Sequence, residues 1–87
     1  MPYIEKLRRK ELDKDNQLEM IGLGCNSEGE LNFVITSICK GYLNKHGLAN
    51  YARFNQTVGA IECCKLELYR HRIAPYEDIK IQENGDV

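Results

Sequence analysis

Tryptophan is absent from this sequence, proline occurs twice, and aromatic residues make up only 8% of the chain. No apolar run approaches the roughly 20 residues that a transmembrane helix needs, so we expect no membrane span. Residues 1–15 are rich in charge and lack the apolar stretch of a secretory signal, which predicts a cytoplasmic protein. Neither charge sign dominates, since 12 Lys and Arg stand against 13 Asp and Glu. This balance argues against a general nucleic-acid-binding protein, which needs a basic surface.

The cysteines show no pattern typical of a metal site. No C-x-x-C pair occurs, and no cysteine and histidine lie at zinc-finger spacing. Two adjacent cysteines fall in a predicted helix, where their side chains point about 100° apart and cannot grip one metal ion. We interpret all the cysteines as small buried apolar residues of a reducing compartment, and we expect no metal ion and no cofactor. They are Cys25, Cys39, Cys63 and Cys64.

The size and composition of the chain predict one small globular domain. The chain has 87 residues and a mass of 10.0 kDa, with 43% hydrophobic and 29% charged residues. A domain of this size buries only about 60–65% of the surface of its unfolded chain, so we expect a thin core. The periodicity described below predicts a single all-α domain over residues 1–87. Its helices are expected near residues 12–23, 28–45 and 54–73.

A capping box marks the clearest helix start. Ser27 is followed three residues later by Glu30, so each side chain can satisfy a backbone N–H at the start of a helix. Apolar residues then recur at helical spacing within about 100° of arc. Lys45, His46 and Gly47 are typical of a helix carboxyl end. These signals predict a helix over residues 28–45 whose apolar face holds Leu31, Val34, Ile35, Ile38 and Tyr42.

A long helix is predicted over residues 54–73. It should end before Pro75, because the residue before a proline disfavours the helical conformation. Its apolar residues form two neighbouring arcs that together cover about 200° of the helix circumference. Such a stripe is too wide for a helix on the surface of a small monomer, so the pattern favours a homo-oligomer. The first arc holds Phe54, Val58, Ile61, Cys64 and Leu68, and the second holds Leu66, Tyr69 and Ile73.

The amino-terminal part of the chain is less regular. A string of apolar residues over 12–23 predicts one amphipathic helix after a charged lead-in. Gly22 and Gly24 should limit that helix, because glycine is a poor helix former.

Residues 75–87 predict an extended tail rather than a helix. Ile79 and Ile81 alternate with a lysine as in a short strand, and Asn84-Gly85 is typical of a turn. A solvated tail would hardly need two isoleucines and a tyrosine. We therefore expect the tail to dock on the body of the protein or on a neighbouring subunit.

Polar residues within the wide stripe are candidates for a binding site. Glu62, Lys65, Tyr69 and Arg72 recur within about 80° of arc on the predicted helix. Glu62 and Lys65 are close enough in sequence to form an ion pair. These residues form either a surface ion-pair ladder or a hydrogen-bonding seam where two subunits or a ligand meet, and the sequence leaves both interpretations open.

Three consecutive basic residues, 70–72, lie near the carboxyl end of the predicted long helix. It either complements the helix dipole or, together with Lys65, binds a phosphate or carboxylate. A nearby tyrosine could stack on a planar ring, whereas Glu77 and Asp78 would repel a phosphate unless they are paired or bind a hydroxyl or amino group. The candidate ligand- or partner-binding residues are Glu62, Lys65, Tyr69, Arg70, Arg72, Tyr76, Glu77 and Asp78.

No motif in the sequence indicates a particular enzymatic reaction. Gly-rich phosphate loops, H-E-x-x-H and G-x-S-x-G are absent. The E-x-x-E and E-x-x-D pairs that hold magnesium in small helical nucleotide pyrophosphatases are absent from the two strongly predicted helices. His46 and His71 lie on different predicted elements, and neither is linked by spacing to a serine or cysteine. We expect no catalytic residue.

Two stretches resemble a family of small proteins of unknown function from bacteriophages and from phage-derived regions of bacterial genomes. They are GELNFVITSI and TVGAIECCKLELYRHRIAPYEDIKIQENGDV, with MPYI at the start. Two positions depart from the family pattern: Arg53 stands where relatives have a capping T-x-x-E, and His71 stands where a second arginine is usual. The second departure weakens the anion-site interpretation. The resemblance implies no activity, only a small phage-related accessory protein made in the host cytoplasm.

These observations favour a non-enzymatic binding protein. We expect a homo-oligomer that acts on a host protein or sequesters an anionic small molecule, for example in counter-defence. One alternative is a small DNA-associated regulator, in which residues 28–45, Arg70 and Arg72 would face nucleic acid, the less favoured partner. Salt-dependent retention on DNA would favour that alternative. A second alternative is an uncharacterised hydrolase, which metal-dependent turnover of nucleotides would favour.

Overall fold

The computed structural model describes residues 3–45, 47 and 50–87. Of these residues, 84% are helical and none lies in a β-strand, which confirms the predicted all-α class. No helix among them is long and apolar enough to cross a membrane. The chain divides into two compact units, residues 3–54 (unit 1) and residues 55–87 (unit 2), and each is described separately.

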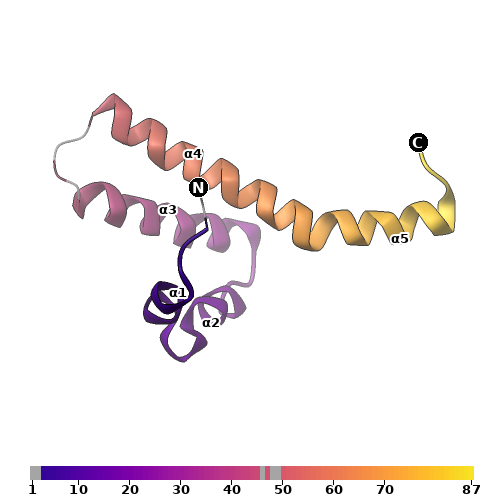
Figure 1. The fold of residues 1–87 in the computed structure, drawn as a ribbon, viewed down its shortest axis with the longest axis horizontal. Coiled ribbons are helices and arrows are strands. Elements are labelled where there is room, and N and C mark those ends of the chain that lie inside the picture. The colour runs from indigo at the N-terminus through magenta and orange to yellow at the C-terminus, as the bar shows by residue number, and fades with distance from the viewer. Residues whose placement is uncertain (1–2, 46, 48–49) are drawn as a thin grey trace. The chain divides into compact units, whose positions relative to one another are not determined.

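Unit 1 begins with two short helices instead of the single helix predicted over residues 12–23. They are α1 (Lys6–Leu12) and α2 (Gln17–Leu23), separated by a 3-10 turn, η1 (Lys14–Asn16) (Figure 1). The predicted start at residue 12 is therefore wrong, because the chain turns there. The predicted limit before Gly24 is confirmed, since α2 ends at Leu23.

The turn between α1 and α2 has a local cause. Asp15 and Asn16 adopt left-handed backbone conformations, with φ of 58° and 55°. Aspartate and asparagine enter this region more readily than other non-glycine residues. The carboxylate of Asp13 then accepts a hydrogen bond from the Leu18 N–H at 3.1 Å, which satisfies a backbone donor at the start of α2.

The capping box predicted at residue 27 is present at the start of α3 (Glu28–Lys45), whose bounds match the predicted helix. Ser27 Oγ accepts a hydrogen bond from the Glu30 N–H at 3.2 Å. Glu30 Oε1 accepts one from the Asn26 N–H at 2.9 Å, one residue earlier than in the predicted box. Beyond the helix, Gly47 has a φ of 85°, as predicted, whereas His46 lies outside the described residues.

Replacing Ser27 with alanine is expected to lower the free energy of unfolding by about 1 kcal/mol, because the Glu30 N–H loses its acceptor. Thermal unfolding followed by circular dichroism measures the change. Ser37→Ala is the matched control. The Ser37 hydroxyl bonds the Phe33 carbonyl within α3, and alanine at such a position should be neutral or slightly stabilising. Equal melting curves for Ser27→Ala and the parent would contradict the capping role.

An asparagine that the sequence analysis overlooked starts the next helix, α4 (Tyr51–Leu68). Asn50 Oδ1 accepts a hydrogen bond from the Arg53 N–H at 2.8 Å, and the Asn50 carbonyl accepts one from the Phe54 N–H at 3.0 Å. Asparagine is among the preferred residues for this capping position. The helix therefore begins about one turn before the predicted residue 54.

Pro75 does not end the helical path, and the extended tail predicted for residues 75–87 is wrong. A wide π turn, η2 (Tyr69–Ile73), leads directly into α5 (Ala74–Asn84) (Figure 1). The Ala74 N–H bonds the Tyr69 carbonyl, five residues back. Pro75 thereby falls in the first turn of α5, where proline is tolerated because the backbone N–H there needs no helical partner.

The end of α5 follows the predicted turn signal. Gly85 has a φ of 86°, and its N–H bonds the Ile81 carbonyl at 2.7 Å. Ile79 and Ile81, which alternate in the sequence, point to different sides of this helix because residues two apart do not share a face. The turn at Asn84-Gly85 is thus confirmed, but it ends a helix instead of a strand.

The described residues contain no buried hydrophobic side chain. On the predicted apolar face of α3, Leu31 is 46% and Tyr42 is 42% exposed. The predicted burial of the cysteines is also wrong: Cys63 and Cys64 are exposed, and Cys25 and Cys39 are only half-buried. The helices are amphipathic as predicted, yet their apolar faces remain open.

Candidate functional site

All of the predicted candidate residues lie in unit 2, and the π turn decides how they are arranged. The Tyr69 hydroxyl donates a hydrogen bond to Glu77 Oε1, eight residues further along the chain. In a regular α-helix such residues lie about 80° apart around the axis. The π turn takes up about one extra residue, so that the two side chains meet on one side of the helix.

The contact with Glu77 raises the pKa of Tyr69 above its ordinary value. The hydrogen bond to the carboxylate has the largest effect, followed by the negative charge of Glu77, burial, and the charge of Asp78. All of these favour the neutral phenol over the phenolate. Since the folded-state pKa lies above the unfolded value, the contact stabilises the protein fully below about pH 10, and that stability is lost as the pH rises through the raised pKa.

Tyr69 is therefore expected to titrate above the ordinary tyrosine range, and Glu77→Gln should move its pKa down toward that range. NMR of protein labelled in the tyrosine rings follows the titration directly. Glu83→Gln is the control, because Glu83 contacts Lys80 instead of Tyr69. A Tyr69 titration curve that is the same with glutamine at residue 77 would contradict the contact.

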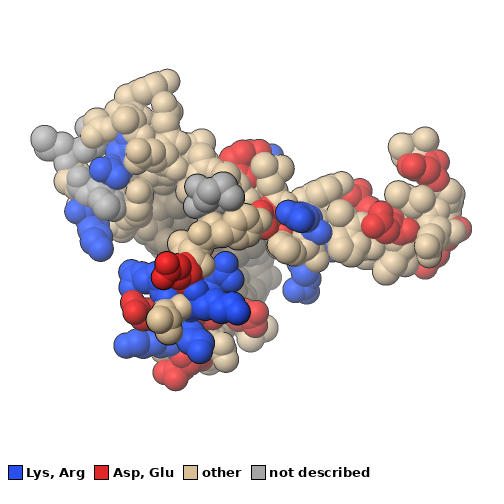
Figure 2. Space-filling model, in the orientation of Figure 1, with Lys and Arg blue, Asp and Glu red and all other residues tan. Residues whose placement is uncertain are grey.

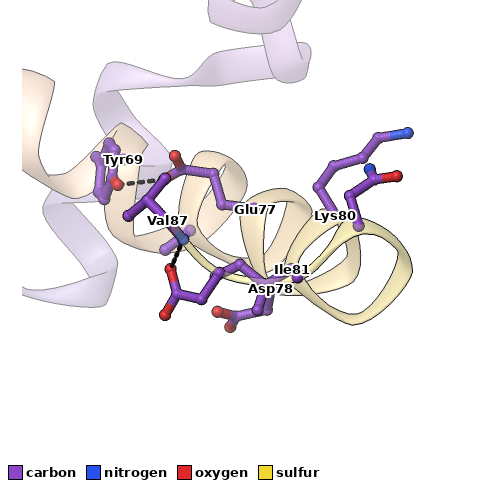
Figure 3. A pocket seen from close by; sticks show the side chains of 10 residues that line it. Tyr69, Glu77, Asp78, Lys80, Ile81 and Val87 are labelled. Atoms are coloured by element: carbon purple, nitrogen blue, oxygen red, sulfur yellow. Dashed lines mark hydrogen bonds between the residues drawn. The ribbon is translucent and has the colours of Figure 1, made fainter.

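A shallow groove of about 450 Å³ lies along α5 and the residues that follow it (Figure 3). Tyr69, Glu77 and Asp78 are on its wall, and Figure 3 shows the Tyr69 hydroxyl directed at Glu77. Three carboxylate side chains and one lysine are among the lining residues, which disfavours an anionic ligand. The complete lining is Tyr69, Ala74, Glu77, Asp78, Lys80, Ile81, Asn84, Gly85, Asp86 and Val87.

The other candidates lie outside this groove. Lys65 Nζ and Glu62 Oε1 are 2.8 Å apart on α4, both well exposed, so that this predicted pair is a surface ion pair and contributes little stability. Arg70 and Arg72 have no hydrogen bond or ion pair with any other described residue. They are two residues apart and point to different sides of the helix, so they cannot jointly hold one small anion.

A family model matches residues 1–87, which is the whole chain. The chain belongs to DUF6899, a domain of unknown function. No curated protein and no solved structure shows significant similarity to it.

For this DUF6899 chain the structure brings together only part of the predicted site. Tyr69, Glu77 and Asp78 share the groove, whereas Glu62 and Lys65 are paired with each other. Tyr76 lies outside the groove, and the Lys80 ammonium sits 5.6 Å from the centre of its ring, a cation–π distance. The arginines do not neutralise Glu77, which bonds Tyr69 instead.

Sequence reasoning overlooked Lys80 and Asp86 because it treated residues 75–87 as extended. The available signal was the spacing of Glu77, Lys80 and Ile81, which is as compatible with a helix as with a strand. Among the described residues, no group of three or more His, Cys, Asp or Glu side chains is placed to hold a metal ion.

Proposed function

We propose that the protein is a non-enzymatic accessory binding protein that acts by binding a host protein. One observation carries this proposal: no hydrophobic side chain is buried among the described residues. Fully burying a Leu, Ile or Phe side chain contributes about 1.5–3 kcal/mol, and the described apolar side chains, which are half-buried or exposed, realise only part of it. A protein partner is the kind of ligand that covers such faces. The sequence resemblance supports a phage-related setting.

The proposed contact surface is an apolar hollow of about 620 Å³ in unit 1, between the end of α2 and the start of α3. Met20, Ile21, Phe33 and Val34 are on its wall, and Phe33 is 72% exposed. Glu30, also on the wall, is already bonded to the Asn26 N–H, so an apolar side chain is the fitting occupant.

The charge of unit 1 further defines the partner. Lys and Arg side chains gather over α1, as Figure 2 shows. α1 holds four basic residues, of which Arg8 is paired with Glu11 at 2.8 Å. We infer that the host protein presents an acidic surface around an apolar anchor residue, because complementary charge steers association and the anchor supplies affinity.

Sequestration of an anionic small molecule remains the second candidate. It is favoured by the free guanidinium groups of Arg70 and Arg72, for which no other described residue provides a partner. It is disfavoured by their opposite orientations and by the carboxylates of the α5 groove.

Native mass spectrometry of the protein purified from infected cells tests both candidates. We expect a species whose mass exceeds a whole multiple of 10.0 kDa by the mass of a host polypeptide. Phe33→Glu should remove that polypeptide with little effect on folding, because the side chain is exposed. Phe33→Leu should retain it, and so should Lys40→Glu, a charge control two turns further along α3. Excess mass of a small molecule would favour sequestration, and no excess would contradict both candidates.

A further inference from the structure

Two adjacent cysteines in α4, Cys63 and Cys64, are free and exposed. Their side chains point about 100° apart around the helix. Cys63 shares its side of the helix with Glu67, four residues further along. Cys64 shares its side with Ile61 and Leu68, on the first predicted apolar arc. Because the two thiols face different sides, a neighbouring element that covers one of them leaves the other accessible.

The helix keeps these two thiols from joining each other. A disulfide usually links Cα atoms about 4.4–6.8 Å apart and needs Cβ atoms about 3.5–4.5 Å apart. Consecutive Cα atoms are only about 3.8 Å apart, and the helix turns the two Cβ atoms away from each other. A bond between Cys63 and Cys64 would therefore require α4 to unwind at this point.

A mixed disulfide formed at one of these cysteines is consequently protected from the other. When the Cys63 thiolate attacks glutathione disulfide, a bond forms between Cys63 Sγ and one glutathione sulfur, and the S–S bond of the reagent breaks. The second glutathione leaves and takes up the proton that Cys63 released, so the cysteine is oxidised and one glutathione is reduced. A resolving thiol would then attack Cys63 Sγ and expel the bound glutathione. Cys64 cannot do so, because that step makes the bond that the helix excludes.

An unpaired cation lies on the Cys63 side of the helix. Arg70 follows Cys63 by seven residues, which returns it to within about 20° of the same direction. The Arg70 guanidinium has no hydrogen bond or ion pair with any other described residue, whereas the nearby Glu67 carboxylate is bonded to His71 at 3.0 Å. A guanidinium binds carboxylates, and glutathione disulfide carries them. The charge at Arg70 therefore favours this anionic reagent over an uncharged disulfide.

We propose that Cys63 and Cys64 are a site of S-glutathionylation, at which each thiol forms a mixed disulfide that its neighbour cannot release while α4 is helical. Such a cap is reversible, since a free thiol removes it by the same exchange. This inference concerns unit 2 and goes beyond the proposed function, which places the host protein on unit 1. The two proposals can fail separately, because the modification is measured on the purified protein alone.

Excess glutathione disulfide added to the purified, reduced chain tests the proposal. An acid quench stops the exchange, and peptic digestion with mass spectrometry then locates the products. We expect glutathione on Cys63 and Cys64 before it appears on the half-buried Cys25 and Cys39. Cys64→Ala should accumulate the Cys63 mixed disulfide to the same level as the parent, because Cys64 does not resolve it.

A bond between Cys63 and Cys64 in the folded parent overturns the proposal, and so does a parental level of the Cys63 mixed disulfide well below that of Cys64→Ala. Reaction of Cys25 and Cys39 as fast as the pair overturns the pair as the site. Circular dichroism checks that the variant stays helical. If Cys64→Ala loses helix, Cys64→Ser replaces it.

Arg70→Gln tests the preference for an anionic reagent. It should slow the reaction of Cys63 with glutathione disulfide by roughly twofold at low salt and leave the reaction with uncharged hydroxyethyl disulfide unchanged. Arg72→Gln is the matched control, because residue 72 points to a different side of the helix from residue 70 and should leave both rates at the parental value. Equal rates of the parent and Arg70→Gln with glutathione disulfide overturn glutathione as the favoured reagent.

Discussion

Ile61→Glu is expected to dissociate the protein into monomers or to unfold it. Ile61 lies near the middle of α4, in the wide apolar stripe predicted over residues 54–73, and is 43% exposed in the single chain. In the homo-oligomer that this stripe favours, a second copy covers Ile61, and an unpaired carboxylate in a packed interface costs several kcal/mol. Light scattering measures the mass, and circular dichroism measures the helix content.

Cys63→Glu is the matched control for that experiment. Cys63 lies two residues beyond Ile61, faces a different side of α4 and is exposed. It introduces the same charge into the same helix without entering the stripe, so the mass should stay that of the parent. Equal masses for Ile61→Glu and the parent would show that the stripe is not the self-association surface.

Deleting His71 is expected to have the second large effect, because it removes the extra residue of the π turn. The turn should tighten to a regular α-helix without a large rotation of α5 relative to α4, because the π turn already takes up the extra residue. Glu77 would then follow Tyr69 by seven residues, or two helical turns, so the contact between them should be kept. Pro75 would also fall inside a continuous helix, which costs about 3 kcal/mol. Chemical denaturation measures the loss of stability, and sedimentation checks that the mass stays that of the parent.

Two further variants separate the loss of the His71 side chain from the effect of placing Pro75 inside a continuous helix. His71→Ala keeps the length of the turn and loses only the contact between His71 Nε2 and Glu67 Oε2, 3.0 Å apart, so we expect a small change. The deletion combined with Pro75→Ala should recover stability, because alanine is well tolerated inside a continuous helix. Equal stability of the deletion variant and the parent would contradict the role of the π turn in accommodating Pro75.

Much of the local structure could be predicted from the sequence because it depends on neighbouring residues. Ser27 and Glu30 are three residues apart and cap α3 at the predicted place. Gly47 and Gly85 take the left-handed conformation that ends a helix without a Cβ clash. Asp15 and Asn16 carried a similar local signal, a cluster of turn-forming residues, which the apolar spacing of residues 12–23 outweighed.

The course of the chain around Pro75 could not be predicted in this way. The rule that a helix ends before proline assumes a regular α-turn, whereas the Ala74 N–H here bonds the carbonyl five residues back. No side-chain pattern in the sequence predicts such a hydrogen bond. The arrangement of the candidate site could not be predicted for the same reason. Tyr69 and Glu77 meet only across the π turn. The groove along α5 forms only when residues 74–84 are helical.

The sequence by itself determined that the protein is all-α, where α3 begins and ends, and which residues share a helix face. Periodicity contains that information because a helix repeats every 3.6 residues. Only the tertiary structure decided that none of the described apolar side chains is buried, that the cysteines are not buried, and that the π turn brings Tyr69 and Glu77 together. Burial depends on what lies opposite a side chain, and spacing along one chain does not specify that neighbour.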